Sequence, residues 1–446
     1  MSNRIQPAGM QGFVIVWIGQ VVSLLGTGMT NFAVSFWIYE QTGEATALTW
    51  AIFFFMAPTI LFSPTAGALI DRSNRKFMMI ISDLVAGVGT IGLLLLLLSG
   101  NLQIWHIYIA NMLAGAANAF QFPAYSAAVT MMLPKEQYAR ASGMLALAQA
   151  ASGILAPAFA GALLGVLGLT GIMTIDVVTF VVAIVALILV HIPQPAETAE
   201  GVSSRGSLWQ ESLYGFRYIW ARPSLLGLQL VFFWINFFSM LGFALLVPMI
   251  LARTGNNELM LASVQSIGAI GGVVGGLLLS AWGGPKRKVH GVLLGMFATS
   301  LFGQGLLGIG QGLVLWAAGS FLTQALIPVL NGSNQAIWQA KVAPDVQGRV
   351  FGVRRVFAQV TAPMATLIAG PLADKLFEPA FREGAGWAQS LAWLVGSGPG
   401  AGMAMIFVLT AVLGATFGLG GYLFPAVRNA EDLLPDHDAV AETAVV

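Results

Sequence analysis

A few ionisable side chains lie within or beside long apolar runs of this 446-residue sequence, and they are the first candidates for chemistry. Asp176 lies inside the run 170–192, and Glu40 follows the run 12–38 closely. Ionisable groups in membrane-spanning runs are energetically costly, so they usually mark functional sites. A carboxyl group taken out of water also keeps its proton more readily, which suits a group that carries protons. We therefore predict Asp176, and after it Glu40, as proton-coupling residues.

The remaining charged residues of the runs suit gating better than proton transfer. Asp83 lies in the run 77–99, near the end where basic residues gather, so we expect an arginine to pair with it. Arg140, Arg349 and Arg354 are the other residues predicted to form gate or ion-pair contacts. A role in packing alone stays open for Asp176, as does hydration at the membrane surface for Glu40.

Neutral polar side chains recur within the same runs and outline a cavity. Gln20, Ser23, Thr27 and Asn31 are spaced so that they share one face of a helix. An apolar cavity with scattered amides suits a bulky amphiphilic solute. Hydrogen bonding between helices is the alternative for each residue taken singly. The predicted substrate-cavity residues are Gln20, Asn31, Gln121, Gln229, Asn236, Asn331 and Gln335.

The elements that hold these residues are predicted to be membrane-spanning helices. Hydrophobic residues make up 57% of the chain and charged residues 9%, against roughly 25% charged in an ordinary soluble domain. A bilayer core needs roughly 20 mostly apolar residues per helix. Twelve such runs occur, at 12–38, 47–70, 77–99, 103–131, 141–167, 170–192, 224–251, 259–283, 289–309, 312–340, 349–375 and 402–425.

The twelve runs fall into two groups of six, which predicts two six-helix bundles around a central cavity. Gln20 and Gln229 are separated by the same number of residues as Gly67 and Gly276, and each pair falls on equivalent runs. Such duplication suits transporters that alternate access to a central site. The predicted division is a bundle over 1–192, a cytoplasmic linker over 193–223, a bundle over 224–425 and a disordered cytoplasmic tail over 426–446.

The basic residues predict the orientation of the chain. Only Arg253, Lys375 and Arg382 of the 20 Lys and Arg residues fall on one side of the predicted membrane. Cytoplasmic loops carry the excess of Lys and Arg, so both termini are predicted to be cytoplasmic, in a multi-pass plasma-membrane protein of the bacterial inner-membrane kind. Within the linker, Trp209, Leu213, Phe216 and Trp220 share a helical face, which predicts an amphipathic helix along the membrane surface; a simple tether is the alternative.

The loop after the second run carries a recognisable motif. Residues 67–76 read G-A-L-I-D-R-S-N-R-K, which resembles the signature G-x-L-x-D-R-x-x-R-K of the major facilitator superfamily. The resemblance implies a conformational latch, made here by Gly67, Asp71, Arg72, Arg75 and Lys76. Its acid would meet a positive helix N-terminus and its bases acids or helix C-termini. The equivalent position of the second half has Ser280 instead of the acid, so the latch is predicted to be asymmetric.

The fifth run contains a second motif of this superfamily. Gly153, Pro157 and Gly161 resemble, imperfectly, the G-x-x-x-G-P-x-x-G-G element of drug/proton antiporters. Proline bends a helix and small residues let a neighbouring helix approach closely. Residues 344–355 and 37–43 resemble a drug-exporter branch that includes macrolide efflux proteins and siderophore exporters. The fourth run lacks the arginine motif of many proton-coupled exporters, which leaves their proton relay in doubt here.

Other classes of protein are disfavoured. The sequence lacks G-x-x-x-x-G-K-[ST], has no cysteine and has four scattered histidines, so we predict no enzyme activity, cofactor or metal. A net charge of +1 gives no reason to expect nucleic acid. We predict a monomeric, lipid-embedded secondary transporter that exports a hydrophobic or amphiphilic small molecule, drug-like, macrolide-like or siderophore-like, by proton antiport. An uncoupled facilitator or lipid-like solute carrier, and a membrane receptor without transport, are the alternatives.

Overall fold

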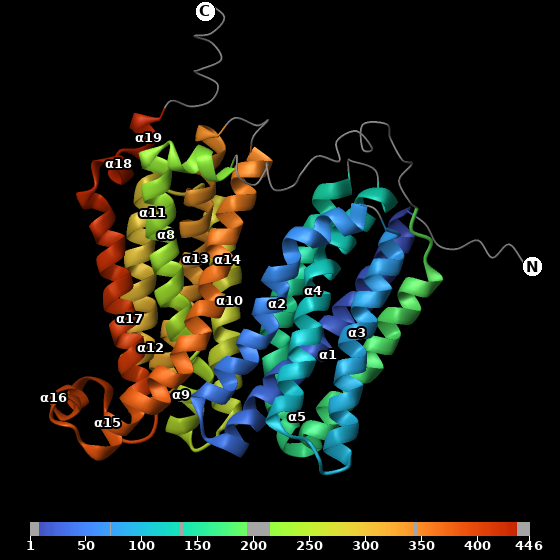
Figure 1. The fold of residues 1–446 in the computed structure, drawn as a ribbon, viewed down its shortest axis with the longest axis horizontal. Coiled ribbons are helices and arrows are strands. Elements are labelled where there is room, and N and C mark those ends of the chain that lie inside the picture. The colour runs from blue at the N-terminus through green and yellow to red at the C-terminus, as the bar shows by residue number, and fades with distance from the viewer. Residues whose placement is uncertain (1–8, 72, 134–136, 194–214, 343–346, 435–446) are drawn as a thin grey trace, which may run out of the picture. The chain divides into compact units, whose positions relative to one another are not determined.

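The fold was analysed in a computed structural model of the full chain. It describes the backbone of residues 9–71, 73–133, 137–193, 215–342 and 347–434, together with most of their side chains. Nearly all of the described residues are helical (Figure 1). The chain divides into two compact units. The first unit contains Met1–Thr198 and Thr254–Ser266, and the second contains Ala199–Arg253 and Ile267–Val446.

The first unit is built from long helices that run along one another (Figure 1). They are α1 (Gly9–Thr42), α2 (Ala45–Asp71), α3 (Arg75–Leu98), α4 (Ile104–Met132), α5 (Tyr138–Leu189) and the beginning of α10 (Glu258–Trp282). Helix α1 packs along α5, and α2 packs along α4. A core of side chains including Phe13, Met79 and Leu187, which are fully buried, joins α1, α3 and α5.

Helix α5 is two membrane-spanning helices with a break between them. It has 52 residues, and its backbone leaves helical geometry at Gly168, where φ is 63°. Glycine tolerates a positive φ because it has no Cβ. The break lies between the runs 141–167 and 170–192, so the sequence had placed this turn correctly.

The second unit contains more and shorter elements. They are α8 (Pro223–Phe243), α9 (Leu246–Thr254), the rest of α10, α11 (Lys288–Ala298), η2 (Thr299–Gln304), α12 (Gly305–Ile309), α13 (Leu313–Lys341), α14 (Gln347–Leu372), η3 (Ala373–Phe377), α15 (Glu378–Glu383), α16 (Gly386–Val395), α17 (Ala401–Gly420), η4 (Gly421–Leu423), α18 (Pro425–Arg428) and α19 (Ala430–Leu433). Helices α11, η2 and α12 form one membrane-spanning segment, Lys288–Ile309, with a π-helical middle.

The described residues contain enough long apolar helices for the predicted twelve spans. Ten segments are long and apolar enough to cross a membrane. One of them, Leu147–Leu189, contains the break at Gly168 and so provides two spans. Helix α4 has 29 residues and was predicted as a further span, which brings the number to twelve. The all-α, twelve-helix prediction is therefore confirmed as a fold class.

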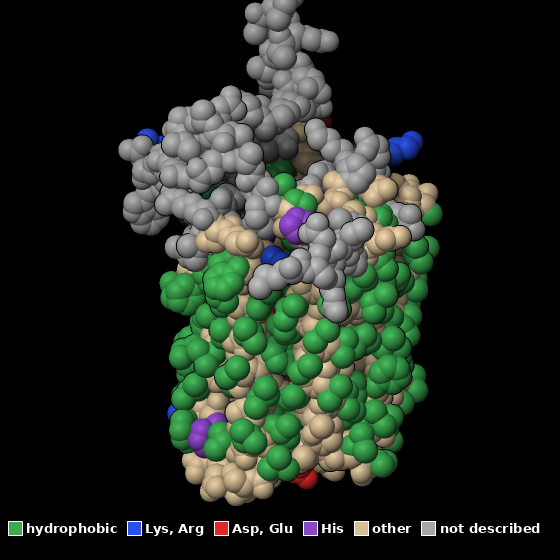
Figure 2. Space-filling model, turned by 90° about the vertical axis from the view of Figure 1, so that its right-hand side faces the viewer, with side chains coloured by type: hydrophobic (Ala, Val, Ile, Leu, Met, Phe, Trp, Pro, Cys, Tyr) green, Lys and Arg blue, Asp and Glu red, His purple; other side chains and the backbone are tan. Residues whose placement is uncertain are grey.

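The outer surface of the first unit is apolar, as lipid contact requires. Figure 2 shows one face of this unit, with hydrophobic side chains over most of it. Val88 and Leu98 of α3 are 62% and 63% exposed, and Val178 of α5 is 57% exposed. A soluble protein would seldom expose so continuous an apolar surface. These side chains therefore face the hydrocarbon of the bilayer.

Only the last part of the predicted linker helix lies within the described chain. Residues 194–214, which include Trp209 and Leu213, lie outside the described part of the chain. Residues 215–220 are helical, but their buried side chain is Ile219, and Trp220 is 71% exposed. Phe216 packs against the core of the second unit together with Ile219. Trp220 thus lies on the surface while Phe216 contacts the core, and an amphipathic helix along the membrane surface stays a prediction.

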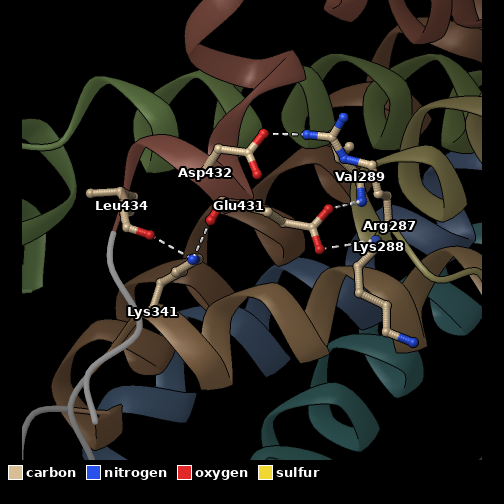
Figure 3. A network of polar contacts seen from close by, with 7 residues as sticks. All are labelled: Arg287, Lys288, Val289, Lys341, Glu431, Asp432 and Leu434. Atoms are coloured by element: carbon tan, nitrogen blue, oxygen red, sulfur yellow. Dashed lines mark hydrogen bonds and ion pairs between the residues drawn. The ribbon is translucent and has the colours of Figure 1, made fainter. Parts of the chain in front are cut away.

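The predicted disordered tail is wrong over 426–434, because these residues fold back onto the second unit as α18 and α19. The Glu431 carboxylate accepts hydrogen bonds from the backbone N–H groups of Lys288 and Val289 at the N-terminus of α11 (3.1 and 2.8 Å; Figure 3). The Lys341 ammonium donates to the backbone carbonyls of Glu431 and Leu434. Residues 435–446 lie outside the described chain, and their predicted disorder stays a prediction.

Candidate functional site

A cavity of about 340 Å³ lies inside the first unit. Helices α1 to α5 all contribute to it, and its lining combines carboxylates, amides and hydroxyls with apolar side chains. Its volume lies within the range of small-molecule sites. The structure brings five of the predicted site residues together here, and they are Gln20, Asn31, Asp83, Gln121 and Asp176.

One end of the polar lining is centred on Asp83 of α3. Gln20 of α1 donates from Nε2 to Asp83 Oδ2 at 3.0 Å, and Gln121 of α4 donates from Nε2 to Asp83 Oδ1 at 2.6 Å. Gln121 Nε2 also lies 3.4 Å from Gln20 Oε1. Among the side chains that the structure describes, Asp83 has amide partners and no arginine. The described partners of Asp83 are thus two neutral donors, and the arginine pairing that we expected stays a prediction, because the side chains of Arg72 and Arg140 lie outside the described part.

The same cluster contains an unused acceptor. Gln121 Oε1 is buried and has no hydrogen-bond partner among the described residues. Buried polar atoms without a partner are uncommon in folded proteins and call for an explanation such as a water, an ion or a ligand. The acceptor belongs to the amide that donates to Asp83, so a hydrogen-bond donor arriving at Asp83 would find it nearby.

The second carboxylate of the cavity is Asp176 of α5, which is 3% exposed. Thr27 of α1 donates from Oγ1 to Asp176 Oδ1 at 3.0 Å. The described hydrogen-bond partner of the Asp176 side chain is thus a hydroxyl group, whereas the described partners of the Asp83 side chain are amide groups. No Lys, Arg or His occurs among the described residues that line the cavity. Its two acids therefore have no basic partner in the lining.

Small residues bring α1 close enough to α5 for the Thr27–Asp176 contact. A Cβ added at Gly26 would lie 2.2 Å from Thr179 Oγ1 and 3.2 Å from Asp176 Oδ1. One added at Gly28 would lie 2.7 Å from the Cβ of Ala156. Distances below 3.0 Å between such atoms require something to move. Gly26 and Gly28 therefore allow α1 to approach α5 closely, and this approach positions Asp176.

The predicted cavity residues of the second unit are not gathered in the same way. Gln335 of α13 accepts a hydrogen bond from Arg354 of α14 at 2.6 Å, and the Arg354 guanidinium lies 5.3 Å from the centre of the Trp338 ring. Gln229 of α8 is buried and Asn236 is half-buried. Asn331 is exposed. Their role in binding a solute stays a prediction.

The motif after α2 is partly described, and one of its bases has a defined partner. Lys76 donates from Nζ to the backbone carbonyls of Ile188 and Val190 at the end of α5 (2.9 and 2.7 Å). Cations at helix C-termini are favourable because the last carbonyls lack helical partners. Arg72, the side chain of Asp71 and the surroundings of Gly67 lie outside the described part. Lys76 thus joins α3 to α5 within one unit, and a latch remains a prediction.

The motif of the fifth span packs against the beginning of α10. A Cβ added at Gly161 would lie 2.6 Å from the Cβ of Ala262, so a larger residue would separate the two helices. Ser266 donates from Oγ to the carbonyl of Ile154 at 2.8 Å. Pro157 is half-buried, and Gly153 is exposed. The small residues therefore permit a close helix contact, as the motif implied, although Gly153 does not share in its burial.

The other candidates lie away from the cavity or outside the described side chains. Glu40 is exposed near the end of α1. The side chains of Arg140 and Arg349 are not among those that the structure describes. Sequence reasoning missed Glu378, whose carboxylate accepts from the N–H groups of Gly400 and Met403 at the start of α17 (3.1 and 2.9 Å). No local pattern in the sequence could have revealed a partner 22 to 25 residues away.

Comparison with known proteins identifies the family. Residues 16–366 match the family model described as the Major Facilitator Superfamily. The chain belongs to the Major Facilitator Superfamily. Two relatives are macrolide efflux protein A of Streptococcus pyogenes, 27% identical over 82% of this chain and 90% of that protein, and multidrug efflux pump Tap of Mycolicibacterium fortuitum, 24% identical over 78% and 86%. The resemblance to this superfamily and to its macrolide efflux branch is thus confirmed.

Solved structures of superfamily-like transporters share the fold. A bacterial homologue of the human lysosomal transporter Spinster has a TM-score of 0.67 at 15% identity, covering 91% of this chain and 95% of that one. The nucleoside transporter NupG has a TM-score of 0.66 at 11% identity, covering 92% and 98%. At such identities the similarity is one of fold alone. This superfamily member is thus a multi-pass membrane transporter with efflux proteins among its relatives.

Proposed function

We propose that this superfamily member exports a hydrophobic or amphiphilic small molecule from the cytoplasm in exchange for protons. The relatives named as macrolide efflux and multidrug efflux proteins support the direction of transport and the class of cargo. The distribution of basic residues supports a bacterial plasma-membrane location with both termini in the cytoplasm. The protein works as a monomer, and two bundles of six helices alternate the access of its cavity to the two sides.

The observation that carries the proposal is the cavity with two acids in the first unit. Phe55, Ile107 and Phe180 contribute apolar surface to the lining, while Asp83 and Asp176 contribute carboxylates. Apolar surface binds the body of an amphiphile through the hydrophobic effect. A few polar groups then fix its orientation.

Asp176 is the proposed proton carrier. Its described side-chain partner is the Thr27 hydroxyl, which is a donor towards a carboxylate and an acceptor towards a carboxylic acid. Rotation of one O–H bond therefore suffices to accommodate either protonation state. Its burial keeps the ionised form costly, so a change of exposure during transport would release or take up the proton. Glu40 is exposed and stands second as a candidate.

Transport by purified protein in liposomes tests the function. A fluorescent amphiphile should accumulate against its gradient when a pH gradient is imposed, and its movement should in turn shift an internal pH dye. Accumulation without any response to the pH gradient would favour the uncoupled facilitator. Absence of flux over a broad panel of amphiphiles would contradict transport and favour the receptor alternative.

Asp176→Asn tests the proton carrier within the same assay. The substitution keeps the size of the side chain and removes the titratable group, so gradient-driven accumulation should fall to the level of protein-free liposomes. Exchange of labelled for unlabelled solute without a gradient should persist, because binding and the conformational change remain. Glu383→Gln, which changes an exposed carboxylate of α15, is the control and should retain gradient-driven transport. Full gradient-driven transport by Asp176→Asn would remove this residue from the mechanism.

A further inference from the structure

We propose that Asp83, Gln20 and Gln121 form a recognition site for a protonated amine, so that the cargo is a cationic amphiphile. This inference rests on the proposed transport function and assigns the class of solute to one end of the same cavity. The three side chains come from α3, α1 and α4, and all of them line the cavity. We call these three residues the amine site.

The hydrogen bonds that Asp83 accepts favour its ionised form over its protonated form. Both of its carboxylate oxygens accept from amide N–H groups, at 3.0 Å from Gln20 and 2.6 Å from Gln121. An amide N–H can only donate, so it stabilises the carboxylate and offers nothing to a carboxylic O–H. An ionised carboxyl group has about four acceptor positions, and two amide donors leave part of that capacity free for a ligand.

The charge of Asp83 has no described counterpart inside the protein. Ionised groups at membrane depth ordinarily pair with an opposite charge. Among the described residues that line the cavity there is no Lys, Arg or His to play that part. A cationic group of the solute would neutralise Asp83 and would add an attractive charge contact to the cavity.

The unused acceptor of the cluster suits an ammonium N–H. Gln121 Oε1 is buried without a partner among the described residues. The Nε2 atom of the same amide donates to Asp83, which places both acceptors within the reach of one cationic head group. An ammonium group carries several donors and no acceptor, so it can satisfy the carboxylate and the amide oxygen together. A carboxylate or phosphate on the solute would face repulsion from Asp83 and gain nothing from this oxygen.

The two acids of the cavity therefore have different tasks. Asp176 is bonded to a hydroxyl that tolerates either protonation state, whereas Asp83 accepts from two amide N–H groups, which favour the anion. Asp83 selects the charge of the cargo, and Asp176 carries the proton. Replacement of Asp83 should therefore change which solutes bind without removing the response to a pH gradient.

Binding of a matched pair of probes to the full-length protein in detergent tests the amine site. Dansylcadaverine has a naphthalene fluorophore and a primary amine that is protonated at neutral pH. Its N-acetyl derivative keeps the fluorophore and chain and loses the charge. The parent protein should bind dansylcadaverine at least about tenfold more tightly than the acetylated probe, in line with one unshielded charge contact.

Three variants separate charge recognition from general damage. Asp83→Asn should remove the preference for the amine while leaving the affinity for the acetylated probe within about twofold. Asp83→Glu keeps the charge and should restore most of the preference. Glu44→Gln removes an exposed carboxylate that is not among the described residues lining the cavity, and it should leave both affinities unchanged. Thermal unfolding of each variant checks that it folds.

The outcomes distinguish this inference from the proposed function. Equal affinity of the parent protein for both probes, or an unchanged preference in Asp83→Asn, would overturn the amine site even if gradient-driven transport of neutral amphiphiles is observed. Failure of every amphiphile to be transported, with the amine preference intact, would instead overturn the transport proposal and leave the amine site standing.

Discussion

The buried charged side chains of the two units have different kinds of hydrogen-bond partner. In the first unit, Asp83 and Asp176 line a cavity, and their described side-chain partners are neutral amides and a hydroxyl. In the second unit, Glu378 and Glu431 accept from backbone N–H groups at the N-termini of α17 and α11. A carboxylate at a helix N-terminus satisfies donors that have no helical partner.

Basic residues of the second unit act in the complementary way. Arg253 donates to the backbone carbonyls of Gly310, Val395 and Gly400, where α12, α16 and α17 end or begin. Lys341 donates to the carbonyls that end α19. Charged side chains that form hydrogen bonds with helix ends stabilise the fold, whereas the acids of the first unit remain available to bind a solute or a proton. The contrast predicts that the partners of a buried charge, more than its burial, distinguish a functional charge from a structural one.

The largest effect on the first unit is expected where α1 meets Asp176. Gly26→Ala would add a Cβ 2.2 Å from Thr179 Oγ1 and 3.1 Å from the Cα of Asp176, so the helices must move apart. We expect a loss of about 2 kcal/mol or more in the free energy of unfolding, together with loss of gradient-driven transport. Thermal unfolding in detergent and transport in liposomes measure the two effects.

Gly92→Ala is the matched control for Gly26→Ala. Gly92 lies in α3 of the same unit, and a Cβ there would meet no atom within 4 Å. Alanine is favoured over glycine in a helix, so this change should be neutral or stabilising by about 0.5 kcal/mol. Equal behaviour of the two variants would show that the close approach of α1 to α5 does not position Asp176.

The second largest effect tests the structural use of charge in the second unit. Glu378→Gln removes a charge that accepts from Gly400 N–H and Met403 N–H, so we expect about 1–2 kcal/mol of destabilisation. Transport per folded molecule should stay coupled to the pH gradient. Glu383→Gln, an exposed change in the same short helix, should alter neither quantity. If Glu378→Gln folded stably but its transport no longer responded to the pH gradient, the charges of the second unit could not be called purely structural.

These contrasts mark what the sequence could and could not predict. Apolar runs and the break at Gly168 predicted the spans, because membrane helices need a minimum apolar length and turns need permissive residues. The helical spacing of Gln20, Thr27 and Asn31 also correctly grouped three residues that line one cavity. The spacing of polar residues along the sequence indicates which residues share one face of a helix, and in α1 that face lines the cavity.

The partners of the acids could not be predicted in the same way. Basic residues close to Asp83 in sequence predicted an arginine partner, but no local pattern indicated the two amides from α1 and α4 that bond to it. Glu431 was assigned to a disordered tail because its surroundings are acidic and polar. Its role at α11 depends on N–H groups 142 and 143 residues away. Contacts between distant residues depend on the packed fold, which local patterns do not contain.

The smallest effect concerns the contact between the end of the described chain and α11. Glu431→Gln should lower the free energy of unfolding by about 1 kcal/mol, because it removes the charge from a double contact with the helix N-terminus. Asp432→Asn is its matched neighbour. Asp432 pairs with Arg287 at the surface, where the two side chains are 63% and 48% exposed, so its loss should cost at most about 0.5 kcal/mol.

The relative stabilities of Glu431→Gln and Asp432→Asn show which contact holds the last described residues to α11. Thermal unfolding at low and high salt measures these stabilities. The exposed Arg287–Asp432 pair should be screened by salt more than the contact of Glu431 with backbone N–H groups. If Asp432→Asn proved the more damaging change, the exposed ion pair rather than the helix terminus would hold the segment. Charge in the second unit would then stabilise the fold through pairs of side chains, and its contrast with the unpaired acids of the first unit would rest on Glu378 alone.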